Sequence, residues 1–234
     1  RGYDYGNRPK GQILFHKYEE EIRTAFEEHL VEGALYAKSE DGSVNIHFTV
    51  SPAHQAGFEK ILQETVGKYE QRYGVKYNIS FSVQDPATDI IAVNEDNTPF
   101  LLADGKPLYR PGGHGALLKN LDAIDGDIIF LKNIDNVVYQ DYLDQTILWK
   151  KVLAGKLIQL RNKIFKYLEL LTDLVAKGAQ DETLYNEVVA FLEKELSIVL
   201  PEASQADKYH ERKHFAFVQE KPLNIYIRIY RLSS

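Results

Sequence analysis

The chain has 234 residues, of which 44% are hydrophobic and 26% are charged. These proportions are typical of a globular protein and exclude a disordered or collagen-like chain. Its 28 Lys and Arg residues stand against 34 Asp and Glu residues, a net charge of −6, which argues against a nucleic-acid partner. Cysteine is absent, so disulfides, thiolate zinc sites and cysteine nucleophiles are excluded.

The sequence offers no membrane or export signal. No apolar run approaches the ~20 residues of a membrane-spanning helix, and the first ten residues lack the apolar segment of a signal peptide. We therefore expect a cytoplasmic protein without a membrane partner. The sequence contains no Met and opens on Arg1, so either it is an excerpt of a longer chain or modified residues have dropped out of it.

Polar residues of the first third are expected to be solvated. A helical pattern covers residues 19–37, and the polar side of this helix is expected to face water. That side contains Glu27, Glu28, His29 and Glu32. His47 and His54 match no metal-binding spacing and are also expected in solvent, and no Ser-His-Asp triad can be argued from the sequence.

The next segment predicts a pair of parallel strands. Apolar residues alternate with polar ones over residues 44–50 and again over 75–83, the pattern of half-buried strands. A helical pattern between them opens at Ser51-Pro52 and stops at Gly74. A strand–helix–strand unit of this kind indicates parallel strands and a right-handed crossover.

A short strand over residues 89–93 and a hairpin over 100–109 follow, with Asp104-Gly105 as its turn. The glycine-rich segment 110–115 then precedes a helix over 116–121. Residues 128–131 form an unbroken apolar run, which is typical of a strand in the middle of a sheet covered on both faces.

The remainder of the chain is mostly helical in pattern. Helices are predicted over residues 141–174, 183–196 and 204–219, the second capped by Asp181, and a strand over 223–232. We therefore predict an α/β fold with a mainly parallel central sheet and a helical C-terminal region. Residues 1–140 are assigned to the α/β core, and residues 141–234 to a helical region, with a final strand, that packs on it.

Two loops are expected to meet at one edge of this sheet. A helix that follows a strand starts at the strand's carboxyl end, which places the loop 111–115 there. The next strand returns to the same edge, where residues 133–136 emerge. Ligands of open α/β sheets bind at that edge.

The residue types in these loops suit a nucleotide. Gly112, Gly113 and Gly115 allow close approach of the backbone, and Asp135 is placed to bind Mg²⁺ between Asn133 and Asn136. Lys132 or Arg110 would neutralise phosphate. The alternative interpretation is architectural: Pro-Gly-Gly is a common tight turn, and Asn-x-Asp-Asn can be an Asx turn.

The stretches Arg110-Pro-Gly-Gly-His-Gly115 and Asp127-Ile-Ile-Phe-Leu-Lys-Asn-Ile-Asp-Asn136 resemble an uncharacterised bacterial domain family, the domain of unknown function numbered forty-three-zero-one. The same two motifs are similar to those of UDP-sugar pyrophosphorylases, which have the nucleotide-diphospho-sugar transferase fold. That resemblance implies that Gly113, His114 and Gly115 line the nucleoside and that Asp135 holds Mg²⁺.

The chain departs from the pyrophosphorylases at one point, because it lacks their opening glycine-rich strand–loop–helix around the triphosphate. We therefore expect the later part of a nucleotidyltransferase-like protein, which joins a sugar 1-phosphate to a nucleoside triphosphate, UTP by resemblance, and releases pyrophosphate. The alternatives are a protein that binds a sugar nucleotide without turnover and an assembly module whose long helix pairs with another subunit.

Overall fold

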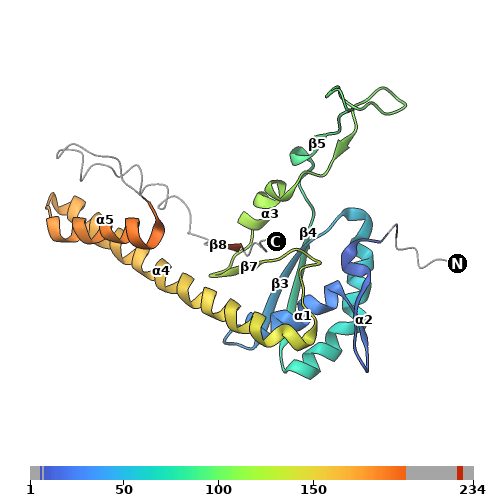
Figure 1. Ribbon diagram of the computed structural model, residues 1–234, viewed down its shortest axis with the longest axis horizontal. Helices are drawn as coiled ribbons and strands as arrows, with labels where there is room; N and C mark the ends of the chain where they lie inside the picture. The colour runs from blue at the N-terminus through green and yellow to red at the C-terminus, as the bar shows by residue number, and fades with distance from the viewer. Residues whose placement is uncertain (1–5, 7, 199–225, 229–234) are drawn as a thin grey trace. The chain divides into compact units, whose positions relative to one another are not determined.

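Helices and strands alternate along the computed structural model, which describes residues 6, 8–198 and 226–228 (Figure 1). The strands and α-helices are β1 (Leu14–Lys17), β2 (Ile22–Thr24), α1 (Ala25–Tyr36), β3 (Ser43–Thr49), α2 (Gln55–Tyr73), β4 (Lys76–Ser82), β5 (Ile90–Ile91), β6 (Tyr109–Arg110), α3 (Leu118–Asp122), β7 (Ile129–Leu131), α4 (Leu143–Lys177), α5 (Glu182–Leu196) and β8 (Tyr226–Arg228). Short 3-10 turns are η2 (Lys10–Gln12), η3 (Pro52–His54), η4 (Pro86–Thr88), η5 (His114–Leu117) and η6 (Gln140–Tyr142).

The chain divides into two compact units. Among the described residues, the first unit consists of residues up to 126, residues 130–151 and residue 228, and the second of residues 127–129, 152–198 and 226–227. No helix among the described residues combines the length and the apolar character that crossing a membrane requires.

The first unit is centred on β3 and β4, which pair in parallel along their whole length, with Val44 opposite Tyr77. Their apolar face packs with α1 and α2 (Figure 1). The buried core consists of Phe26, Leu30, Val31, Val44, Phe48, Val50, Phe58, Tyr69, Val75, Tyr77 and Leu143. Gly74 ends α2 in the left-handed conformation at φ 60°, which favours glycine. The predicted strand–helix–strand unit is confirmed.

The first helix starts later than predicted, because residues 22–24 form β2, which pairs antiparallel with β1. A capping box fixes the start of α1. Glu27 N donates to Thr24 Oγ1 at 3.2 Å, and Thr24 N donates to Glu27 Oε2 at 2.8 Å. These two bonds satisfy backbone N–H groups that would otherwise lack partners at the start of a helix.

The prediction of one mainly parallel central sheet is wrong. The described strands form four two-stranded sheets, and only the β3–β4 sheet is shown to be parallel; β7 pairs with β8 and not with β3 or β4. Residues 90–110, here called the arm, follow β4, and in them β5 pairs antiparallel with β6. Two strands can pair in parallel only when a crossover connection, usually a helix, joins them. The helix before β7, α3, has only five residues and is short for such a crossover. The loop 111–115, which follows β6, and the loop 133–136, which follows β7, therefore do not lie at the edge of one parallel sheet.

The arm contains the predicted hairpin. Leu101 and Pro107 form an antiparallel bridge, and Leu102 N donates to Lys106 O at 2.8 Å. Gly105 has φ +80°, the conformation that a tight turn requires at this position.

The second unit contains most of α4 and all of α5. Its core consists of Tyr167, Leu184, Val188, Phe191 and Leu192. Asp181 accepts a hydrogen bond from Leu184 N at 2.9 Å, which confirms the predicted cap and the helical character of this region. The helix predicted over 204–219 lies outside the described residues, as does the strand predicted over 223–232 except for β8.

Candidate functional site

Four polar side chains meet in the interior of the first unit: Glu32 and Tyr36 from α1, Lys132 after β7, and Lys150 from α4. Lys132 Nζ forms an ion pair with Glu32 Oε2, and Tyr36 OH donates to the same oxygen at 3.0 Å. Glu32 is 1% exposed and Lys150 is 4% exposed. Together these four residues are the Glu32 cluster, in which two lysines surround one buried carboxylate.

Two atoms of the Glu32 cluster, Glu32 Oε1 and Lys150 Nζ, have no hydrogen-bond partner among the described residues. Lys150 Nζ lies 4.8 Å from the ring centroid of Tyr36 and 5.4 Å from that of Phe130. Aromatic faces attract an ammonium group but replace only part of its lost hydration. A buried ammonium without an acceptor is costly. An acceptor group brought to Lys150 Nζ would remove this cost.

Burial lowers the pKa of both lysines of the cluster. Burial, reinforced by Lys132 and opposed by Glu32, lowers the pKa of Lys150 to about 8. Burial likewise lowers the pKa of Lys132 against the attraction of Glu32. At neutral pH most of the Lys150 amines remain protonated, so the cluster holds more positive than negative charge.

His29 of α1 links the Glu32 cluster to the loop that follows β7. Burial and the charge of Lys132 lower the pKa of His29 to about 4, so its ring is neutral at pH 7. His29 Nε2 lies 3.0 Å from the carbonyl oxygen of Ile134. Because a carbonyl only accepts, the Nε2–H donates this bond. Ile134 directly precedes Asp135, and Lys132 lies near enough to lower the pKa of His29, so Lys132 and Asp135 belong to one region.

Asp135 pairs with a lysine that sequence reasoning missed. Lys10 Nζ donates to Asp135 Oδ2 at 2.6 Å, with the two side chains 71% and 38% exposed. This hydrogen bond lowers the pKa of Asp135. Gly11 allows the approach, because a Cβ there would lie 2.6 Å from the Phe58 ring and 3.0 Å from Ile134. No local pattern indicated this contact, since its partners are 125 residues apart.

The neighbours of Asp135 form a tight turn. Asn136 N donates to Asn133 O at 3.0 Å, so the Asn-x-Asp-Asn segment has the turn geometry of its architectural interpretation. This turn does not involve the Asp135 carboxylate, which pairs with Lys10. An architectural role of the segment and a ligand role of Asp135 are therefore compatible.

The glycine-rich loop begins at Arg110 of β6, whose backbone pairs with Ile90. Gly112 is architectural, because a Cβ there would lie 2.8 Å from Thr88 O and 2.9 Å from the Ala116 side chain. Gly113 and Gly115 have open space where a Cβ would be. His114 begins η5. A pocket shared by this loop and residues 133–136 stays a prediction.

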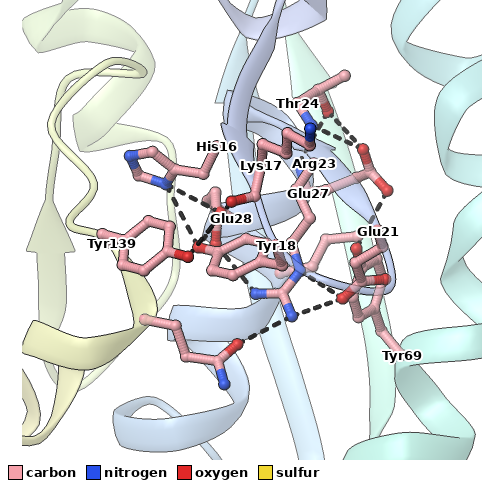
Figure 2. A network of polar contacts seen from close by, with 12 residues as sticks. His16, Lys17, Tyr18, Glu21, Arg23, Thr24, Glu27, Glu28, Tyr69 and Tyr139 are labelled. Carbon is pink, nitrogen blue, oxygen red and sulfur yellow. Dashed lines mark hydrogen bonds and ion pairs between the residues drawn. The ribbon is translucent and has the colours of Figure 1, made fainter.

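A second polar network surrounds Arg23 at the start of α1 (Figure 2). Arg23 Nε donates to Glu21 Oε1 at 2.7 Å, and its Nη1 and Nη2 donate to Glu28 at 3.3 Å and to Gln140 at 3.1 Å. Tyr18 OH donates to Glu28 at 2.6 Å. Arg23 is 3% exposed and Glu28 is 1% exposed.

The expectation that the polar side of α1 is solvated is therefore wrong. Glu27, Glu28 and Glu32 are all buried, and His29 is partly buried. Buried carboxylates are stable only when cations and hydrogen-bond donors surround them. Here the donors come from β1, β2, α2 and the segment after β7, which the local pattern of α1 does not reveal.

The described residues offer no ready-made metal site. No group of three or more His, Asp or Glu side chains among them lies close enough to hold a metal ion. A cation at Asp135 would therefore need further ligands from a substrate.

The comparisons with known proteins define a family without defining an activity. The family described as Domain of unknown function (DUF4301) matches residues 1–230. The chain, with its mixed α/β fold, belongs to this family. Neither the curated proteins nor the solved structures give a match.

Proposed function

We propose that the chain is part of a nucleotidyltransferase-like protein whose Glu32 cluster binds the phosphate groups of a sugar nucleotide. The observation that carries the proposal is the buried Lys150 Nζ without an acceptor, beside a second buried lysine, Lys132. A phosphate group would supply both charge and acceptor oxygens. The resemblance of the two loop motifs to those of UDP-sugar pyrophosphorylases is the reason for proposing a uridine nucleotide and a nucleotide-diphospho-sugar transferase fold for the whole protein.

The proposed reaction needs positioning and charge neutralisation more than covalent chemistry. A phosphate oxygen of the sugar 1-phosphate attacks the α-phosphorus of the nucleoside triphosphate, and pyrophosphate leaves. Lys132 and Lys150 neutralise charge on the phosphates. Arg110, Gly113, His114 and Gly115 are proposed to line the nucleoside.

Asp135 is the proposed ligand for Mg²⁺. One carboxylate fits this cation, because Mg²⁺ is commonly held by one or two carboxylates together with substrate phosphates and water. When bound there, the ion would neutralise phosphate charge. Lys10, which now pairs with Asp135, would be free to contact the substrate. The same ion pair favours the alternative, a protein that binds the sugar nucleotide without turnover, because it occupies the carboxylate.

Lys150→Met should weaken binding of UTP and of UDP-glucose by about 10-fold or more, because a charged hydrogen bond contributes about 1.5–3 kcal/mol. Stability should stay level or rise, since the substitution removes a buried charge that has no hydrogen-bond partner and loses only the contacts of Lys150 Nζ with the Tyr36 and Phe130 rings. In the wild type, affinity should fall as the pH rises above about 8, because the free lysine must then take up a proton to bind an anion.

Calorimetric titrations of wild type, Lys150→Met and the exposed neighbour variant Lys151→Met test this prediction. Lys151→Met should behave like the wild type. Equal affinity of wild type and Lys150→Met rejects the phosphate site. Release of pyrophosphate from UTP and a sugar 1-phosphate by the full-length protein then separates catalysis from binding alone.

Asp135→Asn should remove the Mg²⁺ dependence of nucleotide binding and leave the fold intact. The amide keeps the shape and the turn but lacks the charge that Mg²⁺ requires. The lost ion pair with Lys10 is exposed, so the free energy of unfolding should change by no more than about 1 kcal/mol. Titrations with and without Mg²⁺ are compared with melting curves without ligand. Unchanged affinity in the presence of Mg²⁺ would reject the metal-ligand role of Asp135.

A further inference from the structure

The outer face of the parallel β3–β4 pair carries only polar side chains. Because the strands are in register, alternate residues of both strands share this face, opposite the core. They are Ser43, Asn45, His47 and Thr49 on β3, and Lys76, Asn78, Ser80 and Ser82 on β4. His47 lies directly opposite Ser80, and Ser82 is the next residue along the same face.

Both ring nitrogens of His47 are hydrogen-bonded to serines, contrary to the expectation of a freely solvated histidine. His47 Nδ1 lies 2.8 Å from Ser80 Oγ, and Nε2 lies 2.7 Å from Ser82 Oγ. Burial lowers the pKa of His47, so the ring is neutral at pH 7. A neutral imidazole has one N–H and one lone pair, so one serine accepts and the other donates.

Two further groups contact Ser82 Oγ, namely Asn120 of α3 and Thr49 Oγ1, which lies 3.4 Å away. Asn120 Nδ2 donates to Ser82 Oγ at 2.8 Å and to Val83 O at 2.9 Å. We assign the Ser82 proton to His47 Nε2, because this contact of 2.7 Å is much shorter than the 3.4 Å contact with Thr49 Oγ1. The Nδ1–H of His47 then donates to Ser80 Oγ, which fixes the tautomer of the ring. The result is a serine bonded to a base that a third group orients.

We propose that Ser82 is a nucleophile that takes an acyl group from a small carboxylic ester, with His47 as its general base and Ser80 as the residue that positions His47. These are the roles that define serine–histidine catalysis on unrelated folds. None of the three residues belongs to the Glu32 cluster, so this activity is independent of nucleotide binding.

The proposed steps balance with water as the only co-reactant. Ser82 Oγ attacks the carbonyl carbon and its proton moves to His47 Nε2. The bond to the alcohol oxygen breaks, and that oxygen leaves with the proton from Nε2. Water then attacks the acyl group on Ser82 and gives one proton to Nε2, which returns it to Ser82 Oγ as the carboxylic acid departs.

A fluorophosphonate probe tests the assignment on the full chain, because it reacts with activated serines by the same attack and releases fluoride. Peptide mass spectrometry should locate one adduct on Ser82 of the wild type. Labelling should be lost in Ser82→Ala and slowed about 100-fold or more in His47→Asn, the range for loss of a general base. His54→Asn, which alters a histidine outside this group, should label like the wild type.

Two results would overturn the proposal. The first is absence of an adduct on Ser82 in the wild type, which needs no variant and does not depend on how variants fold. The second is labelling of His47→Asn at the wild-type rate, with circular dichroism showing that the variant is folded. Either result leaves the nucleotide-binding proposal unaffected.

Discussion

Glu32→Gln should lower the free energy of unfolding by about 3 kcal/mol, the range for breaking a buried ion pair from one side. The substitution keeps the shape of the side chain and the contact with Tyr36 but removes the single negative charge of the Glu32 cluster. Lys132 and Lys150 would then face each other as buried cations without a counter-charge. Both already have lowered pKa values in the wild type.

The pH dependence of this loss distinguishes electrostatics from packing. Without Glu32, the folded-state pKa values of the two lysines fall further below their unfolded values. The unfolded state then binds more protons, so stability rises with pH across that interval. The deficit of the variant should be largest at about pH 6 and narrow as the pH rises towards about 8, the pKa of Lys150 in the wild type, because in this interval the folded wild type holds a proton that the folded variant has lost.

Urea denaturation of the single variants and of Glu32→Gln/Lys132→Met provides the measurement. The double variant removes one cation with the carboxylate and should recover part of the loss. Glu64→Gln on α2 is the matched control, since Glu64 is 62% exposed and pairs only with Lys60 at 3.9 Å among the described residues. A Glu32→Gln variant as stable as that control would contradict an electrostatic role for the cluster.

Local patterns in the sequence predicted the parts of the fold that depend on local rules. The alternation in β3 and β4 follows from one apolar and one polar face, and Gly74 and Asp181 end and begin helices through contacts within a few residues. The start of α1 is a missed local signal: Thr24 and Glu27 have the spacing of a capping box, whereas the predicted helix began at residue 19.

The remaining features depend on partners distant in sequence. The apolar run 128–131 indicated burial, but burial does not specify which strand β7 pairs with. Lys132 stays a predicted phosphate ligand, and its ion pair with Glu32 was not predicted, because Glu32 is 100 residues away and its local pattern is that of a solvated residue. Lys150 lay within an ordinary helical pattern. Only the tertiary structure reveals that its amine is buried without an acceptor.

Arg23→Met should destabilise the first unit by about 3–5 kcal/mol, because Glu28 would stay buried after losing a cationic partner. The guanidinium group contacts Glu21, Glu28 and Gln140 at once and lies 4.3 Å from the ring centroid of Tyr18. Methionine fills a similar volume, so the loss reports on charge and hydrogen bonds. Arg23→Lys keeps the charge without the planar fork and should lose less than Arg23→Met.

Acid titration gives this prediction a second readout. Burial alone would raise the pKa of Glu21, but hydrogen bonds from Arg72, Lys68 and Arg23 lower it to about 2 from the ordinary 4.5. The stability that Glu21 contributes is therefore complete above about pH 4.5 and is lost as the pH falls towards 2. Without Arg23 the folded-state pKa of Glu21 rises, so this contribution becomes smaller and its loss ends at a higher pH.

Arg72→Met is the matched control for Arg23→Met, because Arg72 binds the same carboxylate from the surface, with its side chain 38% exposed. We expect a loss of about 1 kcal/mol or less for that surface ion pair. Urea denaturation at pH 7 and at several lower pH values compares the variants. If Arg23→Met and Arg72→Met lost the same small amount of stability, the buried contacts of Arg23 would contribute no more to the free energy of unfolding than the exposed ion pair of Arg72. The burial of Glu28 would then have to be sustained by Tyr18 and His16, whose contacts with Glu28 measure 2.6 and 3.0 Å.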